Sequence, residues 1–314
     1  MNPRVGHIPF SSCCALIGIQ LLFACVSSGI TYATPNAGPS ASPAAQSTPL
    51  DLTALQQQAD KGDANAQYEL GRAYYNGKGV PQDFNKAFDL YQKSANQGNL
   101  KAENNLAVMY AHGDGTTPDL AEAVKWYRKS AEQGAPLPED NLGLMLARGM
   151  GVPKNCKEAA EWYRKAAEQD FLDAEVHLGM LYYFGDTDFP QNYTEAAIWI
   201  TKAADHNNTW AENALGVMYQ NGLGVQQDPA RAASLFQRAA DQGDAKAQSN
   251  LGQLYIDGHG VPKDHIKAYQ WLTLASDAGE ITAVKMLVGF EAGLTDQEKA
   301  EGKKLAAEWR TQRK

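Results

Sequence analysis

The sequence predicts an all-α solenoid, a stack of antiparallel helix pairs, and two observations carry that prediction. A set of leucines recurs along the chain at nearly constant spacing, and the segment around each leucine contains two helical patterns. The spacings are 36, 36, 36, 37 and 36 residues, between Leu70, Leu106, Leu142, Leu178, Leu215 and Leu251. Six copies in register indicate a repeat protein in which each copy is one supersecondary unit.

The first helix of each copy has one apolar face. In the first copy, small and apolar residues stand at i, i+4, i+7, i+8 and i+11, from Ala66 through Leu70 to Gly77. A glycine follows each key leucine by seven residues, at Gly77, Gly113, Gly149, Gly185, Gly222 and Gly258. We expect these glycines to end the first helices, because that position commonly adopts the left-handed conformation.

The second helix of each copy has its own start signal and a packing stripe. An Asp or Asn stands at the expected N-cap in every copy, at Asp83, Asp119, Asn155, Asn192, Asp228 and Asp264. Three of these caps have a glutamate three residues later, the capping-box arrangement. Tryptophan at 126, 162, 199 and 271 alternates with leucine at 90 and 235 in one column. This exchange favours packing over a glycan-binding stripe.

The loop "LGVMYQNGLGV", residues 215–225, has two glycines spaced as in a nucleotide-binding loop. A dinucleotide fingerprint requires a strand before the glycines and a helix N-terminus that cradles the phosphate. Here the glycines end a helix and the loop recurs in every copy. The sequence therefore predicts a connection between two antiparallel helices.

That loop, followed by "ARAASLFQRAADQG", and its five sister copies resemble the Sel1-like repeat, a relative of the tetratricopeptide repeat. The six copies are 63–98, 99–134, 135–170, 171–207, 208–243 and 244–279. The resemblance implies a right-handed, tetratricopeptide-like superhelix that binds other proteins. It also implies, for bacterial members, frequent export and roles in envelope regulation or host contact.

Two copies depart from the pattern. In repeat three, Pro138 replaces a small residue, so we expect its first helix to start late. In repeat four, Thr187 replaces the second loop glycine and the loop carries one extra residue. This loop is either a local contact site or a tolerated insertion. Some relatives carry a disulfide in each repeat, and this chain does not.

Both ends of the repeat array carry predicted caps. Residues 51–62 form a lone opening helix, and residues 280–314 form a partial repeat followed by a closing helix. In the partial repeat, Ala283 and Leu287 stay in register. The closing helix begins with Thr295 as N-cap and Glu298 three residues later.

The N-terminus carries the features of an export signal. Residues 13–26 are almost uninterruptedly apolar, and "TYA" favours cleavage after Ala33. The competing hypothesis is lipoprotein processing at Cys25, after "LFA", and an uncleaved anchor is the third. We expect residues 1–33 to be a signal peptide and 34–50, rich in Pro, Ala and Ser, to be a flexible linker.

The predicted destination is the periplasm or the exterior, with an outer-membrane lipoprotein as the alternative. In that case the membrane is reached only through the lipid anchor. Cleavage after Ala33 leaves Cys156 as the one cysteine and excludes an intrachain disulfide. The net charge of −8 and pI near 5.3 argue against a nucleic-acid partner.

No residue pattern indicates catalysis, a cofactor or a metal. The histidines outside the leader lack the i, i+4 spacing of a helical zinc site, and His259 and His265 flank one turn as surface residues. Cys156 follows an N-cap and lies near Lys154 and Lys157, so a reactive thiol is one hypothesis. A helix-start residue in a variable column is the other.

The candidate binding surface is the side of the first helices opposite the key leucines, at positions −1, +2 and +6. Its predicted residues are Asn105, Val108, His112, Asn141, Leu144, Arg148, His177, Met180, Phe184, Asn250, Gln253 and Asp257. Met180 and Phe184 are the predicted hot spot, and the asparagines are predicted to bind a peptide backbone. The alternative is an ordinary solvated face.

These observations together predict a non-enzymatic scaffold that binds a segment of a partner protein on its concave face. Two alternatives stay open. One is a peptidoglycan- or glycan-binding, or hydrolysing, envelope protein that uses acidic groove residues. The other is a structural envelope lipoprotein. The partner's identity does not follow from the sequence, because repeat surfaces vary while their cores stay fixed.

Overall fold

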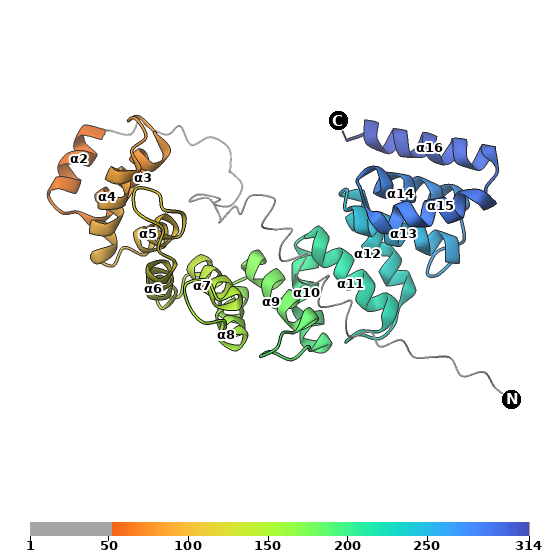
Figure 1. The fold of residues 1–314 in the computed structure, drawn as a ribbon, viewed down its shortest axis with the longest axis horizontal. Helices are drawn as coiled ribbons and strands as arrows, with labels where there is room; N and C mark the ends of the chain where they lie inside the picture. The colour runs from red at the N-terminus through yellow and green to blue at the C-terminus, as the bar shows by residue number, and fades with distance from the viewer. Residues whose placement is uncertain (1–51, 314) are drawn as a thin grey trace. The chain divides into compact units, whose positions relative to one another are not determined.

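The computed structural model describes residues 52–313, which form fifteen α-helices, one short 3₁₀ helix and no β-strand (Figure 1). The all-α prediction is therefore confirmed. None of the helices in this range has both the length and the apolar composition needed to cross a membrane. The predicted signal peptide, its cleavage site, the lipidation site at Cys25 and the linker lie outside the described residues.

Every repeat contributes two helices, as predicted. The first helices are α3 (Ala64–Asn76), α5 (Leu100–His112), α7 (Pro136–Arg148), α9 (Leu172–Phe184), α11 (Thr209–Asn221) and α13 (Ala245–Asp257). The second helices are α4 (Phe84–Asn96), α6 (Leu120–Ala131), α8 (Cys156–Ala167), α10 (Tyr193–Asp205), α12 (Pro229–Asp241) and α14 (His265–Asp277). Before them comes α2 (Leu52–Asp60), and after them come α15 (Ile281–Phe290), η1 (Glu291–Gly293) and α16 (Asp296–Thr311).

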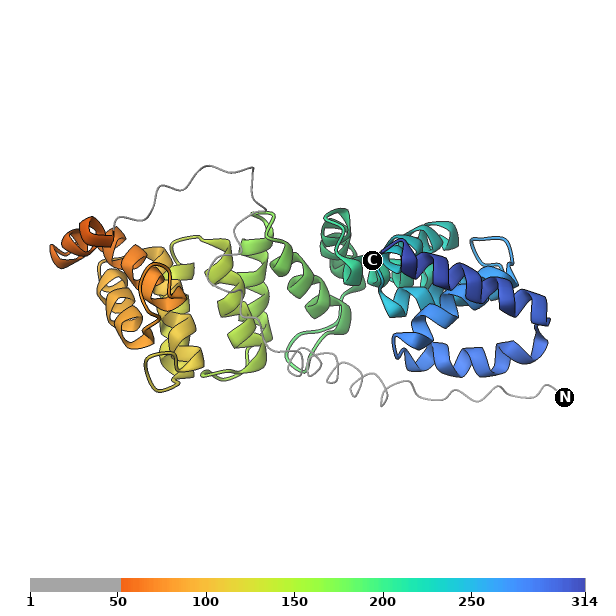
Figure 2. The ribbon, with the colours of Figure 1, turned by 90° about the horizontal axis from the view of Figure 1, so that it is seen from above.

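The chain divides into two compact units. The first contains α2 to α6 and the loop segment 150–153, and the second contains α7 to α16. Within each unit, every α-helix up to α15 packs against its neighbours in the chain, whereas α16 packs on α14 (Figure 2). This nearest-neighbour packing is the defining property of a helical solenoid.

The predicted helix boundaries are formed by the predicted groups. At the N-cap of α4, the side chain of Asp83 accepts a hydrogen bond from the Lys86 N–H, and the other five caps in that column do the same for their own helices. At the end of α3, Gly77 has φ 65° and donates to the carbonyl of Ala73. The full reciprocal capping box is present at Thr295 and Glu298.

The expected late start of the first helix in repeat three is wrong. Helix α7 begins at Pro136 and has 13 residues, like the other first helices. Pro136 is at N1, and Pro138 is still within the first turn, where the backbone N–H groups have no partner inside the helix. A proline therefore removes no hydrogen bond at either position.

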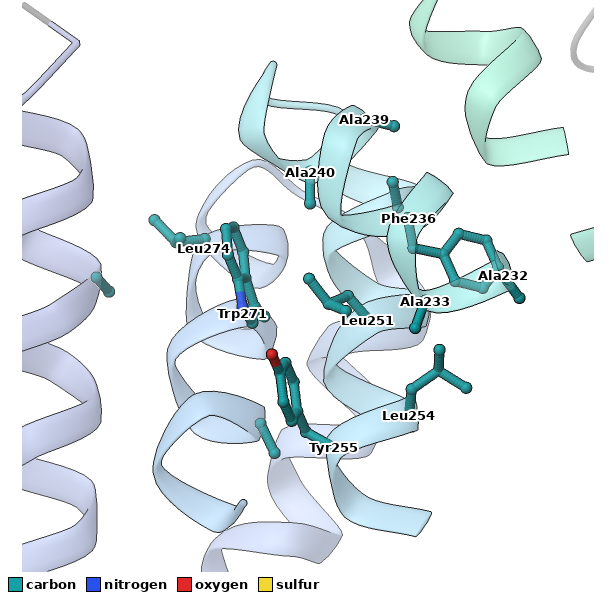
Figure 3. Close-up of a cluster of buried hydrophobic side chains, with 13 residues drawn as sticks. Ala232, Ala233, Phe236, Ala239, Ala240, Leu251, Leu254, Tyr255, Trp271 and Leu274 are labelled. Atoms are coloured by element: carbon teal, nitrogen blue, oxygen red, sulfur yellow. The ribbon is translucent and has the colours of Figure 1, made fainter. Parts of the chain in front are cut away.

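The core forms where a small residue of the first helix meets a large residue of the second helix. A Cβ added to Gly143 would lie 2.7 Å from Cδ1 of Tyr163, and one added to Gly216 would lie 2.6 Å from Cε1 of Phe236. Beside the Gly216–Phe236 contact, Phe236 belongs to a cluster of buried side chains from α12, α13 and α14 that includes Leu251 and Trp271 (Figure 3). The tryptophan column is half-buried at Trp126 and buried at positions 162, 199 and 271, which confirms the packing interpretation.

We expect Gly143→Ala to lower the free energy of unfolding by about 1–3 kcal/mol, because the new methyl group overlaps the buried Tyr163 ring. Gly289→Ala is the matched control, since nothing lies within 4 Å of a Cβ at this helical glycine. The control should be neutral or stabilising by up to about 1 kcal/mol. Urea unfolding followed by circular dichroism measures both, and equal shifts in the two variants would contradict the packing argument.

Candidate protein-interaction surface

The predicted groove is narrower than the helical wheel implied. Asn105, Val108 and Asn141 are buried, with exposed fractions of 5%, 2% and 8%, so their predicted role in the groove is wrong. Successive first helices contact one another on this side. His177 of α9 reaches Asp140 of α7, and the Asn250 amide of α13 donates to the side-chain oxygen of Asn213 in α11 at 2.9 Å. Neighbouring first helices therefore cover part of the face that was predicted to be free.

The other nine predicted residues keep accessible side chains. His112 and Phe184 are exposed, and seven are half-buried: Leu144, Arg148, His177, Met180, Asn250, Gln253 and Asp257. His112 belongs to the first unit and the remaining eight belong to the second. Within the second unit, Leu144 and Arg148 on α7 hold the same repeat positions as Met180 and Phe184 on α9. The structure therefore supports one short accessible surface on α7 and α9.

Helix α9 is the least polar of the six first helices in composition. Its sequence, "LDAEVHLGMLYYF", is apolar on almost every side, yet only four of its 13 residues are buried. Phe184 is 42% exposed, and its ring meets the ring of Tyr183 edge to face at 4.9 Å between centroids. Met180 lies four residues earlier, on the same side of the helix. The predicted hot spot is therefore accessible.

An ion pair between a half-buried histidine and a buried aspartate lies beside this surface. Nδ1 of His177 is 2.8 Å from an oxygen of Asp140, and the imidazole packs 5.2 Å from the ring of Tyr163. Burial lowers the pKa of His177, but the charge of Asp140 and its hydrogen bond outweigh burial, with a further contribution from Asp173. The net pKa is raised from its usual value of about 6.5, although the nearby Arg148 opposes the increase.

A column of buried acids was missed in the sequence, where carboxylates were interpreted as solvated. Three residues before each key leucine stands a buried Glu or Gln: Gln67, Glu103, Glu139, Glu175, Glu212 and Gln248. Gln133 donates to Glu103 at 2.6 Å, and Lys129 pairs with the same carboxylate at 2.9 Å. The recurrence of Glu or Gln at this position in every repeat was the signal in the sequence that could have indicated a buried, structural role.

These acids join the two helices of one repeat. The Gln169 amide donates to Glu139 and the Gln242 amide donates to Glu212, each across 30 residues. In repeat four, His206 stands beside Glu175 in place of the glutamine. Burial raises the pKa of the carboxyl groups at 139, 175 and 212. Their partners come from the chain's own second helices, so they are positioned to hold the repeat together.

The thiol of Cys156 is not poised for reaction. The residue is 1% exposed, and its Sγ lies 3.9 Å from the carbonyl oxygen of Ala147. Burial and the adjacent Asp188 raise the pKa of the thiol to about 12. The reactive-thiol hypothesis is therefore wrong for the folded chain, since the helix N-terminus and Lys154 are outweighed.

The altered loop of repeat four is a structural contact. In other repeats the second loop glycine lies against the first turn of the preceding second helix, as Gly224 lies against Tyr193. In repeat four, the Asp188 carboxylate instead accepts a 2.9 Å hydrogen bond from the Cys156 N–H. Asp186 pairs with Lys154 at 2.7 Å. In repeat four, a hydrogen bond from the backbone to a carboxylate thus replaces the close contact between two backbones for which the other repeats use glycine.

Among residues 52–313, one cluster combines three side chains of metal-binding type, namely Cys156, Asp186 and Asp188. Its donors already have partners in the chain. Lys154 forms an ion pair with Asp186, and the Asp188 carboxylate accepts a hydrogen bond from the first backbone N–H of α8. His265, which was considered with His259 as a surface pair, lies 3.4 Å from Glu298.

The His177–Asp140 pair predicts a pH-dependent contribution to stability. Because the pKa of His177 is raised in the folded state, the contribution is full below about pH 6.5 and is lost as the pH rises through the folded pKa. We expect His177→Gln to destabilise by about 0.3–1 kcal/mol at pH 5.5 and by less at pH 8.5. Urea unfolding at both pH values measures the difference. An equal loss at both would show that His177 acts through packing alone.

We expect iodoacetamide to leave Cys156 unmodified at pH 8 in the folded chain and to alkylate it readily in urea. Mass spectrometry of the peptide that contains Cys156 separates it from the cysteines at 13, 14 and 25. Comparable labelling in both conditions would contradict the burial of the thiol.

Comparisons with known proteins agree with this architecture. A family model described as the Sel1 repeat matches six segments, residues 64–99, 100–134, 140–171, 172–208, 211–244 and 245–280. The same fold occurs in c5321 of uropathogenic Escherichia coli, a protective antigen with an SLR fold, at 33% identity and a TM-score of 0.71. The match covers 82% of this chain and 56% of that protein, so this chain spans little more than half of its length.

A Sel1 repeat protein from Oxalobacter formigenes is also 33% identical, with a TM-score of 0.63 over 76% of this chain and 96% of that one. The comparison with curated proteins found no match. The family model covers more than half of the sequence, in the same six copies that the leucine spacing defines. The chain therefore belongs to the Sel1 repeat family.

Proposed function

We propose that the chain is a non-enzymatic scaffold of the cell envelope that binds a segment of another protein through α7 and α9. The observation that carries the proposal is the accessible apolar pair Met180 and Phe184 on α9, the least polar of the first helices. Sel1 repeats generally mediate protein–protein interaction, which supports a protein partner.

The side chains around the pair indicate the chemistry of the partner. Leu144 extends the apolar surface from α7, and Arg148 stands at the repeat position that Phe184 holds in α9. Buried apolar anchors supply most of the affinity in protein interfaces, and a neighbouring Arg selects a carboxylate. The proposed ligand is a segment with one or two large apolar residues followed by an acidic residue.

The envelope location rests on the apolar segment 13–26 and the small residues before Thr34. Soluble export to the periplasm or the exterior is the proposal, and lipid attachment at Cys25 is its alternative. Mass spectrometry of the mature N-terminus separates the two, because lipidation adds a diacylglycerol to Cys25.

We expect Met180→Ala/Phe184→Ala to lower partner capture at least tenfold, because it removes both apolar anchors without disturbing buried residues. Residues 34–314 serve as bait in a pull-down from the native envelope, with quantitative mass spectrometry as the measurement. Ile198→Ala on α10 is the matched control, since Ile198 is a comparably exposed apolar residue on a second helix.

A protein enriched by the wild type and the control, and lost with the double variant, would support the proposal. Equal enrichment by all three baits would place binding elsewhere on the chain. If no protein is enriched, the same baits should be tested on peptidoglycan fragments, where binding or cleavage would support the envelope-glycan alternative.

A further inference from the structure

The seventh first-type helix, α15, lacks the covering that every earlier first helix has. Leu287 holds the key leucine position, and Ala283 is fully buried, so α15 continues the register of the array. In each earlier repeat, the following helix in the chain packs back on its own first helix. After α15, η1 and the Thr295 cap redirect the chain, and α16 takes a different course.

Helix α16 packs along α14 (Figures 1 and 2). The rings of Trp271 and Trp309 meet edge to face at 6.2 Å between centroids. Gly302 lets the two backbones approach, because an added Cβ would lie 2.8 Å from the ring of Tyr269. Arg310 forms an ion pair with Asp277. The predicted closing helix is present, but it covers α14.

Three large apolar side chains of α15 remain exposed as a result. Ile281 is 68% exposed, Val284 is 43% exposed and Val288 is 74% exposed. They stand at i, i+3 and i+7, the spacing of one stripe along a helix. We call these three residues the α15 stripe.

The α15 stripe occupies the positions that an earlier repeat covers with its own second helix. The position of Ile281 corresponds to Leu100, whose carbonyl accepts from the hydroxyl of Ser130 in α6. The position of Val284 corresponds to Glu103, which Lys129 of α6 and Gln133, just after α6, contact.

The third position of the α15 stripe, that of Val288, corresponds to Gly143, which contacts Tyr163 of α8. The surface of α15 is thus in register with an established helix–helix interface, and what covers that interface in the other repeats is a helix.

Two residue changes make the stripe unsuitable for a second helix of the usual kind. Val284 replaces the buried Glu or Gln, so the glutamine of a second helix would find no polar partner. Val288 replaces the Gly or Ala that leaves room for a large side chain such as Tyr163 or Phe236. The result is an apolar ridge, which fits a partner helix that also presents medium-sized apolar side chains.

We propose that the α15 stripe pairs with the α15 stripe of a second copy of this chain, antiparallel across a two-fold axis. A two-fold interface brings the same surface together from both copies, and a row of three β-branched residues is its own complement. Within residues 52–313, the other exposed large apolar residues, Leu120, Phe184 and Ile198, lie singly on three different helices.

The expected association is weak. A stable dimer usually buries about 800 Å² on each partner, and a ten-residue helix with three exposed apolar side chains offers less. The dimer should therefore form in a concentration-dependent way in the micromolar range or above. Lys285, which is exposed on the same helix, keeps the rim of the interface polar.

Sedimentation velocity of the full chain from about 5 to 500 µM tests the proposal. We expect the wild type to shift from monomer toward dimer and Val284→Lys/Val288→Lys to weaken the association at least tenfold. Ile198→Lys is the control, because it places the same charge at an exposed isoleucine on α10 and should leave the association unchanged. Far-ultraviolet circular dichroism checks that all three chains keep their helices.

A second measurement locates the contact. Hydrogen exchange of the backbone amides in residues 281–290 should slow as the wild-type concentration rises, and should not change in the double-lysine variant. A wild type that stays monomeric throughout would overturn the proposal. So would a dimer that both lysine variants weaken equally, or one that the double variant leaves intact. The result is independent of the Met180 and Phe184 experiment, which concerns a different helix.

Discussion

One contact sets the geometry of every repeat. A glycine or alanine on the first helix packs against a large side chain on the second helix of the same repeat. Gly71 meets Tyr91, Gly143 meets Tyr163 and Gly216 meets Phe236. This close approach also brings the buried carboxylates within reach of the glutamines at the end of the second helix. Burying a charge is costly unless it is paired, so the acids depend on the spacing that the glycines provide.

Local chemistry was predictable from the sequence, whereas relations between neighbours were not. The caps at Asp83 and Gly77 follow from the few backbone groups at a helix end, and one sequence shows them directly. Asn105 is buried beside Tyr68 and Tyr91 of the preceding repeat, which a helical wheel of one helix omits. The buried Glu103 was missed although its column recurs at about 36 residues, because its partners lie 26 and 30 residues away, beyond the first helix that the wheel describes.

Changes from the repeat pattern concentrate in repeat four. Its loop uses the Asp188 carboxylate where other repeats use a glycine contact, its first helix is the least polar of the six, and His206 replaces the usual glutamine beside the buried acid. Asn207, with φ of 60°, stands where most repeats have glycine after the second helix, and Asp170, with φ of 58°, does the same at the end of repeat three. Asp and Asn tolerate this conformation better than other residues with side chains. A repeat can change its surface in this way while its register with the neighbours is preserved.

The second loop glycines have a consequence for how such an array grows. Gly115 touches Phe84 and Gly260 touches Pro229, so each loop fits the first turn of the second helix one repeat earlier. A duplication of one repeat in the gene copies both the loop glycine and the helix turn that it contacts. The array can therefore lengthen without new matching surfaces. Repeat four is the exception, because Asp188 matches the backbone of Cys156 through a loop that is one residue longer. The Lys154–Asp186 ion pair adds a match of side chains between repeats three and four, so separating these two repeats would break it.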